Sequence, residues 1–142
     1  MRKRTRERRS PDVRLVLICV GGALGTGLRY LISGAMVQWL GPGFPYGTLA
    51  VNVLGSFITG VIQEVGTTSL LIPDTTRLFL TVGMMGGLTT YSTFSYETVR
   101  LMEGDAWRQA WINLILTSTF CLTVCFLGIA AGRWLVGLKG GT

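Results

Sequence analysis

Hydrophobic residues run in four long stretches along this chain, with short polar turns between them. The stretches cover residues 15 to 39, 47 to 66, 76 to 99 and 107 to 136. A helix needs roughly 20 apolar residues to cross the hydrocarbon layer of a membrane, whereas a barrel strand needs only about 10. Each stretch is therefore long enough for a helix that spans a membrane. The pattern predicts an all-α membrane protein with four transmembrane helices.

The turns between these stretches are rich in residues that end helices. They lie at residues 41 to 45, at 73 and 74, and at 103 to 105. Because these connections are short, neighbouring helices are expected to run antiparallel. We divide the chain into a basic amino-terminal tail, residues 1 to 14, and one transmembrane domain, residues 15 to 142.

The composition agrees with a membrane location and restricts the chemistry. Hydrophobic residues make up 49% of the chain and charged residues only 14%, which is unusually apolar for a soluble domain. There is no histidine, so the usual general base and zinc ligand are missing. Cys19, Cys121 and Cys125 all fall in hydrophobic stretches, where we expect neither disulfides nor a metal cluster. We therefore expect no enzyme.

Basic residues gather on one side of the predicted membrane domain. With four spans, the amino-terminal tail, the 67 to 75 loop and the carboxyl-terminal tail share a side, whose basic residues are Arg2, Lys3, Arg4, Arg6, Arg8, Arg9, Arg14, Arg77, Arg133 and Lys139. The other side has Arg100 and Arg108. The positive-inside rule then predicts both termini in the cytoplasm. We interpret the first ten residues as an anchor at the lipid headgroups, rather than a nucleic-acid arm or a cleaved signal peptide.

Pairs of glycines four residues apart indicate close contacts between helices. Gly21 and Gly25 form one such pair, and Gly128 and Gly132 form another. This spacing lets two helix backbones touch inside a membrane. The glycines of residues 21 to 27 do not follow the G-x-G-x-x-G order of a dinucleotide-binding turn.

The segment GGLTTYSTFS, residues 86 to 95, predicts a break in the third span. Adjacent glycines followed by threonines are poor helix formers, so we place the break near Gly86 to Thr90. Broken helices persist in membranes only where they are buried in protein or line water. Carbonyls at such a break can bind a small cation, and the half-helix after it offers amides to anions.

Two pairs of side chains follow this break on adjacent faces of the half-helix. Tyr91 and Phe94 are three residues apart, and so are Ser92 and Ser95. The edges of aromatic rings carry partial positive charge, so the paired rings beside hydroxyl groups can face an anion.

Polar residues inside the other spans have both a structural and a functional interpretation. Arg29 could reach the interface or could give positive potential to a water-filled vestibule that admits anions. Asn52 could join two helices or line such a path. The last span has a stripe with a period of four residues, made of Asn113, Thr117, Cys121 and Cys125. Thr117 could instead bond to its own backbone.

Three motifs together resemble the Fluc (CrcB) family of fluoride channels. They are GALGTGLRY at residues 22 to 30, GTLAVNVLGSFITG at 47 to 60 and GGLTTYSTFSYET at 86 to 98. The resemblance covers nearly the whole chain from about residue 15. It implies an antiparallel, dual-topology dimer with a structural sodium ion at its centre, bound by the backbone carbonyls of Gly86 and Thr89.

The resemblance also assigns roles along the anion path. Tyr91 and Phe94 take the places of two pore phenylalanines, and Asn52 that of the pore amide. The stripe on the last span takes the place of the family's polar track, with Thr93, Ser95 and Thr117 as further donors and Glu97 and Thr98 at the pore exit. The chain departs from the family pattern at Tyr91, which carries a phenol, and at Cys121 and Cys125, which replace stronger hydrogen-bonding residues.

The function that the resemblance implies is passive, fluoride-selective export from the cytoplasm across the plasma (inner) membrane of a prokaryote, which lowers fluoride toxicity. The expected partners are fluoride, sodium, the lipid bilayer and a second copy of the chain, with no nucleic acid. Because the charge bias opposes two-way insertion, a heterodimer with an oppositely oriented paralogue is the alternative assembly. The alternative functions are a small dual-topology multidrug-type cation exporter, which needs an acidic residue near the centre of a span, and a non-transporting scaffold subunit.

Overall fold

The computed structural model describes residues 11–68 and 72–140, and every regular element in these ranges is helical. Three helices are long and apolar enough to cross a membrane: α1 (Pro11–Leu40), α2 (Tyr46–Thr68) and α6 (Trp107–Gly140). The prediction of an all-α membrane protein is confirmed, and three of the four expected spans are single helices. Residues 1–10 of the expected basic tail lie outside the described residues, and its last four residues form the first turn of α1.

The segment expected to be the third span consists of several shorter helices. α3 (Asp74–Leu78), a π-helical segment η1 (Phe79–Met85) and α4 (Gly86–Leu88) follow one another without a gap, and α5 (Tyr91–Glu103) begins after two extended residues. The predicted break is confirmed. None of these pieces alone is long enough to cross a membrane, so the segment can serve as a fourth span only as a broken one.

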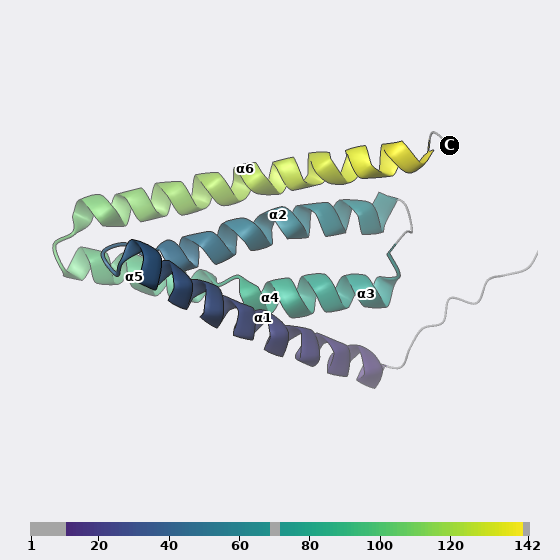
Figure 1. Ribbon diagram of the computed structural model, residues 1–142, viewed down its shortest axis with the longest axis horizontal. Coiled ribbons are helices and arrows are strands. Elements are labelled where there is room, and N and C mark those ends of the chain that lie inside the picture. The colour runs from purple at the N-terminus through teal and green to yellow at the C-terminus, as the bar shows by residue number, and fades with distance from the viewer. Residues whose placement is uncertain (1–10, 69–71, 141–142) are drawn as a thin grey trace, which may run out of the picture.

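The helices lie alongside one another and alternate in direction along the chain (Figure 1). α1 and the α3 to α5 segment run in one direction, and α2 and α6 run in the other. The start of α1 and the end of α6 therefore lie at the same end of the molecule, together with the end of α2 and the start of α3. The prediction of antiparallel neighbours is confirmed.

Glycines allow α1 to press against the interrupted segment. A Cβ atom added at Gly21 would lie 2.7 Å from the carbonyl oxygen of Phe79, and one at Gly25 would overlap the carbonyl of Met84. Only a residue without a side chain permits such backbone contact. The close approach predicted from the spacing of Gly21 and Gly25 is confirmed.

The second glycine pair serves the contact between α2 and α6. A Cβ at Gly128 would overlap the carbonyl oxygen of Phe57, and one at Gly132 would lie 2.9 Å from the Cβ of Glu64. From the α2 side, Gly60 faces the carbonyl oxygen of Cys125 in the same way. This predicted contact is also confirmed.

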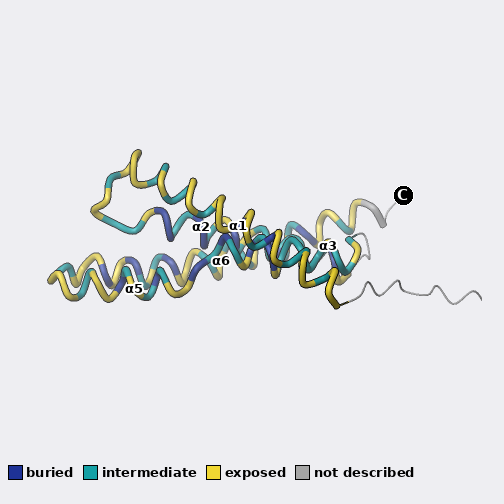
Figure 2. Tube along the Cα trace, turned by 90° about the horizontal axis from the view of Figure 1, so that it is seen from below, coloured by how far each residue is buried: buried dark blue, intermediate teal, exposed yellow. Residues whose placement is uncertain are grey.

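Buried residues lie mainly where the helices face one another, and exposed residues lie on their outer faces (Figure 2). Many of the exposed residues are large and apolar. The buried core is small, with Val51, Met85 and Leu88 at its centre. Outside it, Leu31 is 65% exposed and Phe126 is 70% exposed. An apolar exterior of this extent suits contact with lipid rather than water.

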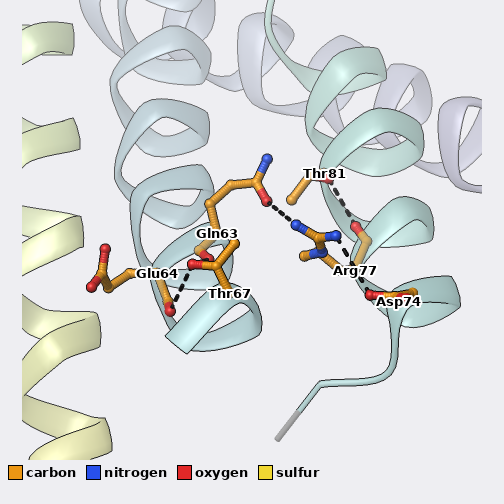
Figure 3. A network of polar contacts seen from close by, with 6 residues as sticks. All are labelled: Gln63, Glu64, Thr67, Asp74, Arg77 and Thr81. Atoms are coloured by element: carbon orange, nitrogen blue, oxygen red, sulfur yellow. Dashed lines mark hydrogen bonds and ion pairs between the residues drawn. The ribbon is translucent and has the colours of Figure 1, made fainter. Parts of the chain in front are cut away.

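Polar contacts join the helices at the end where α2 stops and α3 starts (Figure 3). Arg77 lies 3.4 Å from the side-chain oxygen of Gln63 and 3.5 Å from a carboxylate oxygen of Asp74. On the other side of α2, Arg133 of α6 donates to Glu64 over 3.1 Å. Exposed pairs of this kind contribute little stability each, so we assign them the role of aligning helix ends.

Candidate functional site

The break between α4 and α5 is held by a side chain from a different helix. The backbone N–H of Thr90 donates to Oδ1 of Asn52 over 2.7 Å, and Nδ2 of Asn52 donates to the carbonyl oxygen of Thr90 over 3.1 Å. Both residues are buried. Asn52 therefore supplies the hydrogen bonds that Thr90 would otherwise make within a helix.

The side chain of Thr90 then begins the next helix. Its Oγ1 accepts from the N–H of Thr93 over 3.2 Å, which is the usual cap at a helix start. The same oxygen donates to Oγ1 of Thr93 over 2.9 Å, and Oγ of Ser92 lies 3.3 Å away. Three hydroxyl groups thus gather at the amino-terminal end of α5.

These two interactions release the carbonyls that were expected to bind sodium. In an unbroken α-helix, the carbonyl of Gly86 would accept from the N–H of Thr90, and that of Thr89 from the N–H of Thr93. Here both amides donate elsewhere, to Asn52 and to the Thr90 side chain. Backbone carbonyl oxygens suit a hard cation, so the donor chemistry at the break fits a sodium ion.

The break occupies only part of the predicted range from Gly86 to Thr90. Gly86 keeps helical dihedral angles, with φ −61° and ψ −37°, and the chain becomes extended only at Thr89 and Thr90. The break thus falls at the threonine end of the predicted range, and the glycines remain helical. A Cβ at Gly87 would overlap the carbonyl oxygen of Gly22, so this glycine permits the approach of α1.

A groove of about 520 Å³ opens beside the break, between α2, α5 and α6. Its walls contain seven residues to which the sequence analysis gave a role: Asn52, Thr89, Tyr91, Phe94, Thr117, Cys121 and Cys125. The groove also has polar residues that the sequence analysis missed, namely Ser56, Thr59 and Ser118. The spacing of Asn52, Ser56 and Thr59 along α2 places them on one helix face, and this regularity could have revealed them.

The aromatic pair at the start of α5 lies against this groove. The ring centroids of Tyr91 and Phe94 are 5.6 Å apart and the rings are tilted by 50°. Phe94 is only 5% exposed, whereas Tyr91 is 80% exposed. Phe94 is thus fixed within the chain, and Tyr91 projects away from it.

A chain of hydrogen bonds connects α5 to the polar stripe of α6. Asn113, which is 1% exposed, donates to Oγ1 of Thr98 over 2.9 Å and accepts from Oγ1 of Thr117 over 3.2 Å. Thr98 in turn donates to the carbonyl oxygen of Phe94 over 2.7 Å. Asn113 is not among the residues that line the groove, and it connects Thr117 with the helix that carries Phe94.

Other predicted site residues lie away from the groove. Ser95 donates to the carbonyl oxygen of Tyr91 over 2.9 Å. Thr93 and Glu97 line a second hollow of about 430 Å³ near the turn between α1 and α2. Arg29 lies on α1 and lines neither of these two hollows.

Comparison with known proteins gives a consistent result. The family model described as "CrcB-like protein, Camphor Resistance (CrcB)" matches residues 16–129. A protein of Geobacter sp. (strain M21) is 47% identical over 121 residues, which are 85% of this chain and 98% of the relative. Relatives from Citrifermentans bemidjiense and Magnetococcus marinus are 48% and 40% identical over the same shares of both chains. Each of the three is named "Fluoride-specific ion channel FluC".

Proposed function

The chain belongs to the CrcB family, and we propose that it is a fluoride-selective channel through which cytoplasmic fluoride leaves the cell down its electrochemical gradient. Its curated relatives are named as ion channels and not as enzymes. The observation that carries the proposal is the groove in which the Asn52 amide, the Phe94 ring and the hydroxyl groups of α2 and α6 converge beside an interrupted helix.

The groove has the kinds of donor that a small anion needs when it gives up water. Asn52 uses one N–H for the Thr90 carbonyl, and its second N–H is available for an anion. The hydroxyl groups of Ser56, Thr59 and Ser118 lie in the same walls. Fluoride is smaller than chloride and holds its water more tightly. Fixed donors that lie close together can take the place of that water around the small ion, and they fit the larger chloride less well, which favours fluoride.

The ring of Phe94 supplies a different kind of contact. Because it is nearly fully buried, its position is restricted by the residues packed around it. Ring edges carry partial positive charge without a bound proton or a full charge. They can stabilise fluoride without holding it strongly enough to stop conduction.

We extend the proposal to the assembly and to sodium. Tyr91 is 80% exposed beside the groove, which suits coverage by a second copy. An antiparallel partner would also place two further carbonyls near those of Gly86 and Thr89, and four oxygens form a more complete shell for sodium. We favour the homodimer over a heterodimer with an oppositely oriented paralogue.

The assembly can be tested by the orientation of the termini in the inner membrane of a prokaryote. The start of α1 and the end of α6 lie at the same end of the molecule (Figure 1). If the chain forms a dual-topology homodimer, a reporter tag on either terminus will be found on both sides of the membrane. Exposure on the cytoplasmic side alone, when the chain is expressed without a paralogue, would rule out this homodimer.

The role in the cell is tested by growth in fluoride. Bacteria without a fluoride exporter of their own should regain growth at high fluoride when they express this chain. Expression of Phe94→Ile at the same level is the matched control and should not restore growth. Equal sensitivity with and without the wild-type chain at the membrane would contradict the proposed export.

A further inference from the structure

Two thiols lie together in the wall of the groove. Cys121 and Cys125 are four residues apart on α6, both are partly exposed, and both line the groove. Residues at this spacing are neighbours on a helix surface, with Cβ atoms about 5–6 Å apart. Cys19, the third cysteine, lies on α1 and is absent from the groove walls.

The surroundings of the thiol pair restrict what it can bind. Within residues 11–68 and 72–140, no group of three or more histidine, cysteine or acidic side chains comes together. An ion that needs four protein ligands, such as structural zinc, therefore does not suit this place. Thiophilic ions that are satisfied by two sulfur atoms do suit it.

We propose that Cys121 and Cys125 together form a binding site for a two-coordinate thiophilic metal ion, of which Hg²⁺ is the best-suited example, and that its occupancy closes the groove to anions. The claim that the metal closes the groove rests on the proposed function. The claim that the two cysteines bind the metal does not depend on that function.

The spacing of the two cysteines along α6 allows both sulfur atoms to reach one ion. Metal–sulfur bonds of roughly 2.3 Å, the length found for zinc thiolates, place two sulfurs about 4.6 Å apart across the metal. This separation is compatible with side chains one helical turn apart. When Hg²⁺ binds, both S–H bonds break, two Hg–S bonds form, and two protons pass to water without any oxidation or reduction.

The charge of the mercury–dithiolate unit also suits the groove. One Hg²⁺ ion and two thiolates make a neutral unit, which costs little to hold in an apolar groove. The side chains of Leu122 and Phe94 contribute to the same walls. The metal would lie next to Thr117 along the polar stripe that an anion is proposed to follow, so it would obstruct that path.

The binding experiment uses the purified full-length chain carrying Cys19→Ser, treated with mercuric chloride and measured by intact mass. The expected result is one mercury per chain with the loss of two protons. Cys19→Ser with Cys121→Ser and Cys125→Ser should bind none. Two mercury ions per Cys19→Ser chain, one on each thiol, would overturn the shared site, and so would the absence of binding.

The transport experiment uses the same two variants in proteoliposomes. Mercuric chloride should lower fluoride release by Cys19→Ser about ten-fold or more, and excess dithiothreitol should restore it. The variant without all three cysteines should be unaffected. Undiminished release by Cys19→Ser with mercury bound would overturn the closure. If the wild-type chain also fails to release fluoride, the proposed function fails, and the mass measurement still decides the metal site.

Discussion

The amide side chain of Asn52 and the backbone of Thr90 form a closed ring of two hydrogen bonds, 2.7 Å and 3.1 Å long, across 38 positions of the chain. One bond replaces a helical acceptor for the Thr90 N–H, and the other replaces a helical donor for its carbonyl. A break in a helix leaves both groups without partners, and this is costly where water is absent. These two bonds are what make an interrupted helix tolerable in the buried interior.

Removing this ring should lower stability substantially. Asn52→Ala leaves a buried donor and a buried acceptor unpaired, and we expect a loss of about 2–4 kcal/mol in the free energy of unfolding. Thermal unfolding of the purified protein in detergent measures it. Gln38→Ala, which removes an exposed amide from α1, is the matched control and should change stability by less than about 0.5 kcal/mol.

Asn52→Asp allows the two hydrogen bonds between residue 52 and Thr90 to be tested separately by a change of pH. A carboxylate can still accept from the Thr90 N–H, but it cannot donate to the carbonyl and repels it. We therefore expect the variant to be less stable than the wild type at neutral pH and to recover stability in acid, where a protonated carboxyl can donate. A melting temperature that does not rise from neutral to acid pH, relative to the wild type, would contradict the assigned role of the Asn52 N–H.

Two glycines of α1 should respond in opposite ways to the same substitution. At Gly25 an added Cβ would overlap the carbonyl oxygen of Met84, whereas Gly27 has nothing within 4 Å. Gly25→Ala should push α1 away from η1 and α4 and lower the melting temperature strongly. Gly27→Ala should be neutral or stabilising by up to about 1 kcal/mol, because alanine favours the helix. Similar melting temperatures for the two variants would contradict the described contact.

Transport measurements should distinguish the roles of Tyr91 and Phe94. Phe94→Ile keeps an apolar side chain in the groove but removes the ring edge, so fluoride release should fall about ten-fold or more. Tyr91→Phe removes only a phenolic hydroxyl from an exposed ring, so release should stay near that of the wild type. Both are measured in proteoliposomes with equal amounts of protein. Unchanged release by Phe94→Ile would remove the proposed role of the ring edge.

Sodium and Gly86 should act at the same step of assembly. A Cβ at Gly86 would meet only the carbonyl oxygen of Thr81, 3.9 Å away, so the single chain has room for a side chain there. We expect Gly86→Val to keep its helix content and to lose dimers on size-exclusion chromatography. Replacing sodium with a large organic cation should cause the same loss in the wild type and little further loss in the variant. A variant that dimerises and binds sodium normally would contradict the proposed site.

Much of the fold could be predicted because it depends on local patterns. Runs of apolar residues with short turns mark α1, α2 and α6, and glycine spacing marks where helices touch. The π-helical segment at Phe79–Met85 was not predicted. It lies where α1 presses on the chain through Gly21 and Gly25, a contact between distant parts of the sequence.

The break illustrates where local reasoning ends. Poor helix formers indicated that the helix stops near Gly86 to Thr90, yet the glycines stay helical and the threonines become extended. What decides the position is the contact of Thr90 with Asn52, which no local propensity records. Likewise, the stripe on α6 was predicted from its spacing, but its division into groove residues and the buried Asn113 depends on α2 and α5.

The most direct test of the central claim is anion release from proteoliposomes that contain only the purified wild-type chain. Vesicles are loaded with fluoride or with chloride. An ion-selective electrode then follows each anion under conditions in which no membrane potential opposes its release. The account predicts rapid release of fluoride and release of chloride no faster than from protein-free vesicles. Fluoride retained as in protein-free vesicles, or chloride released as fast as fluoride, would contradict it.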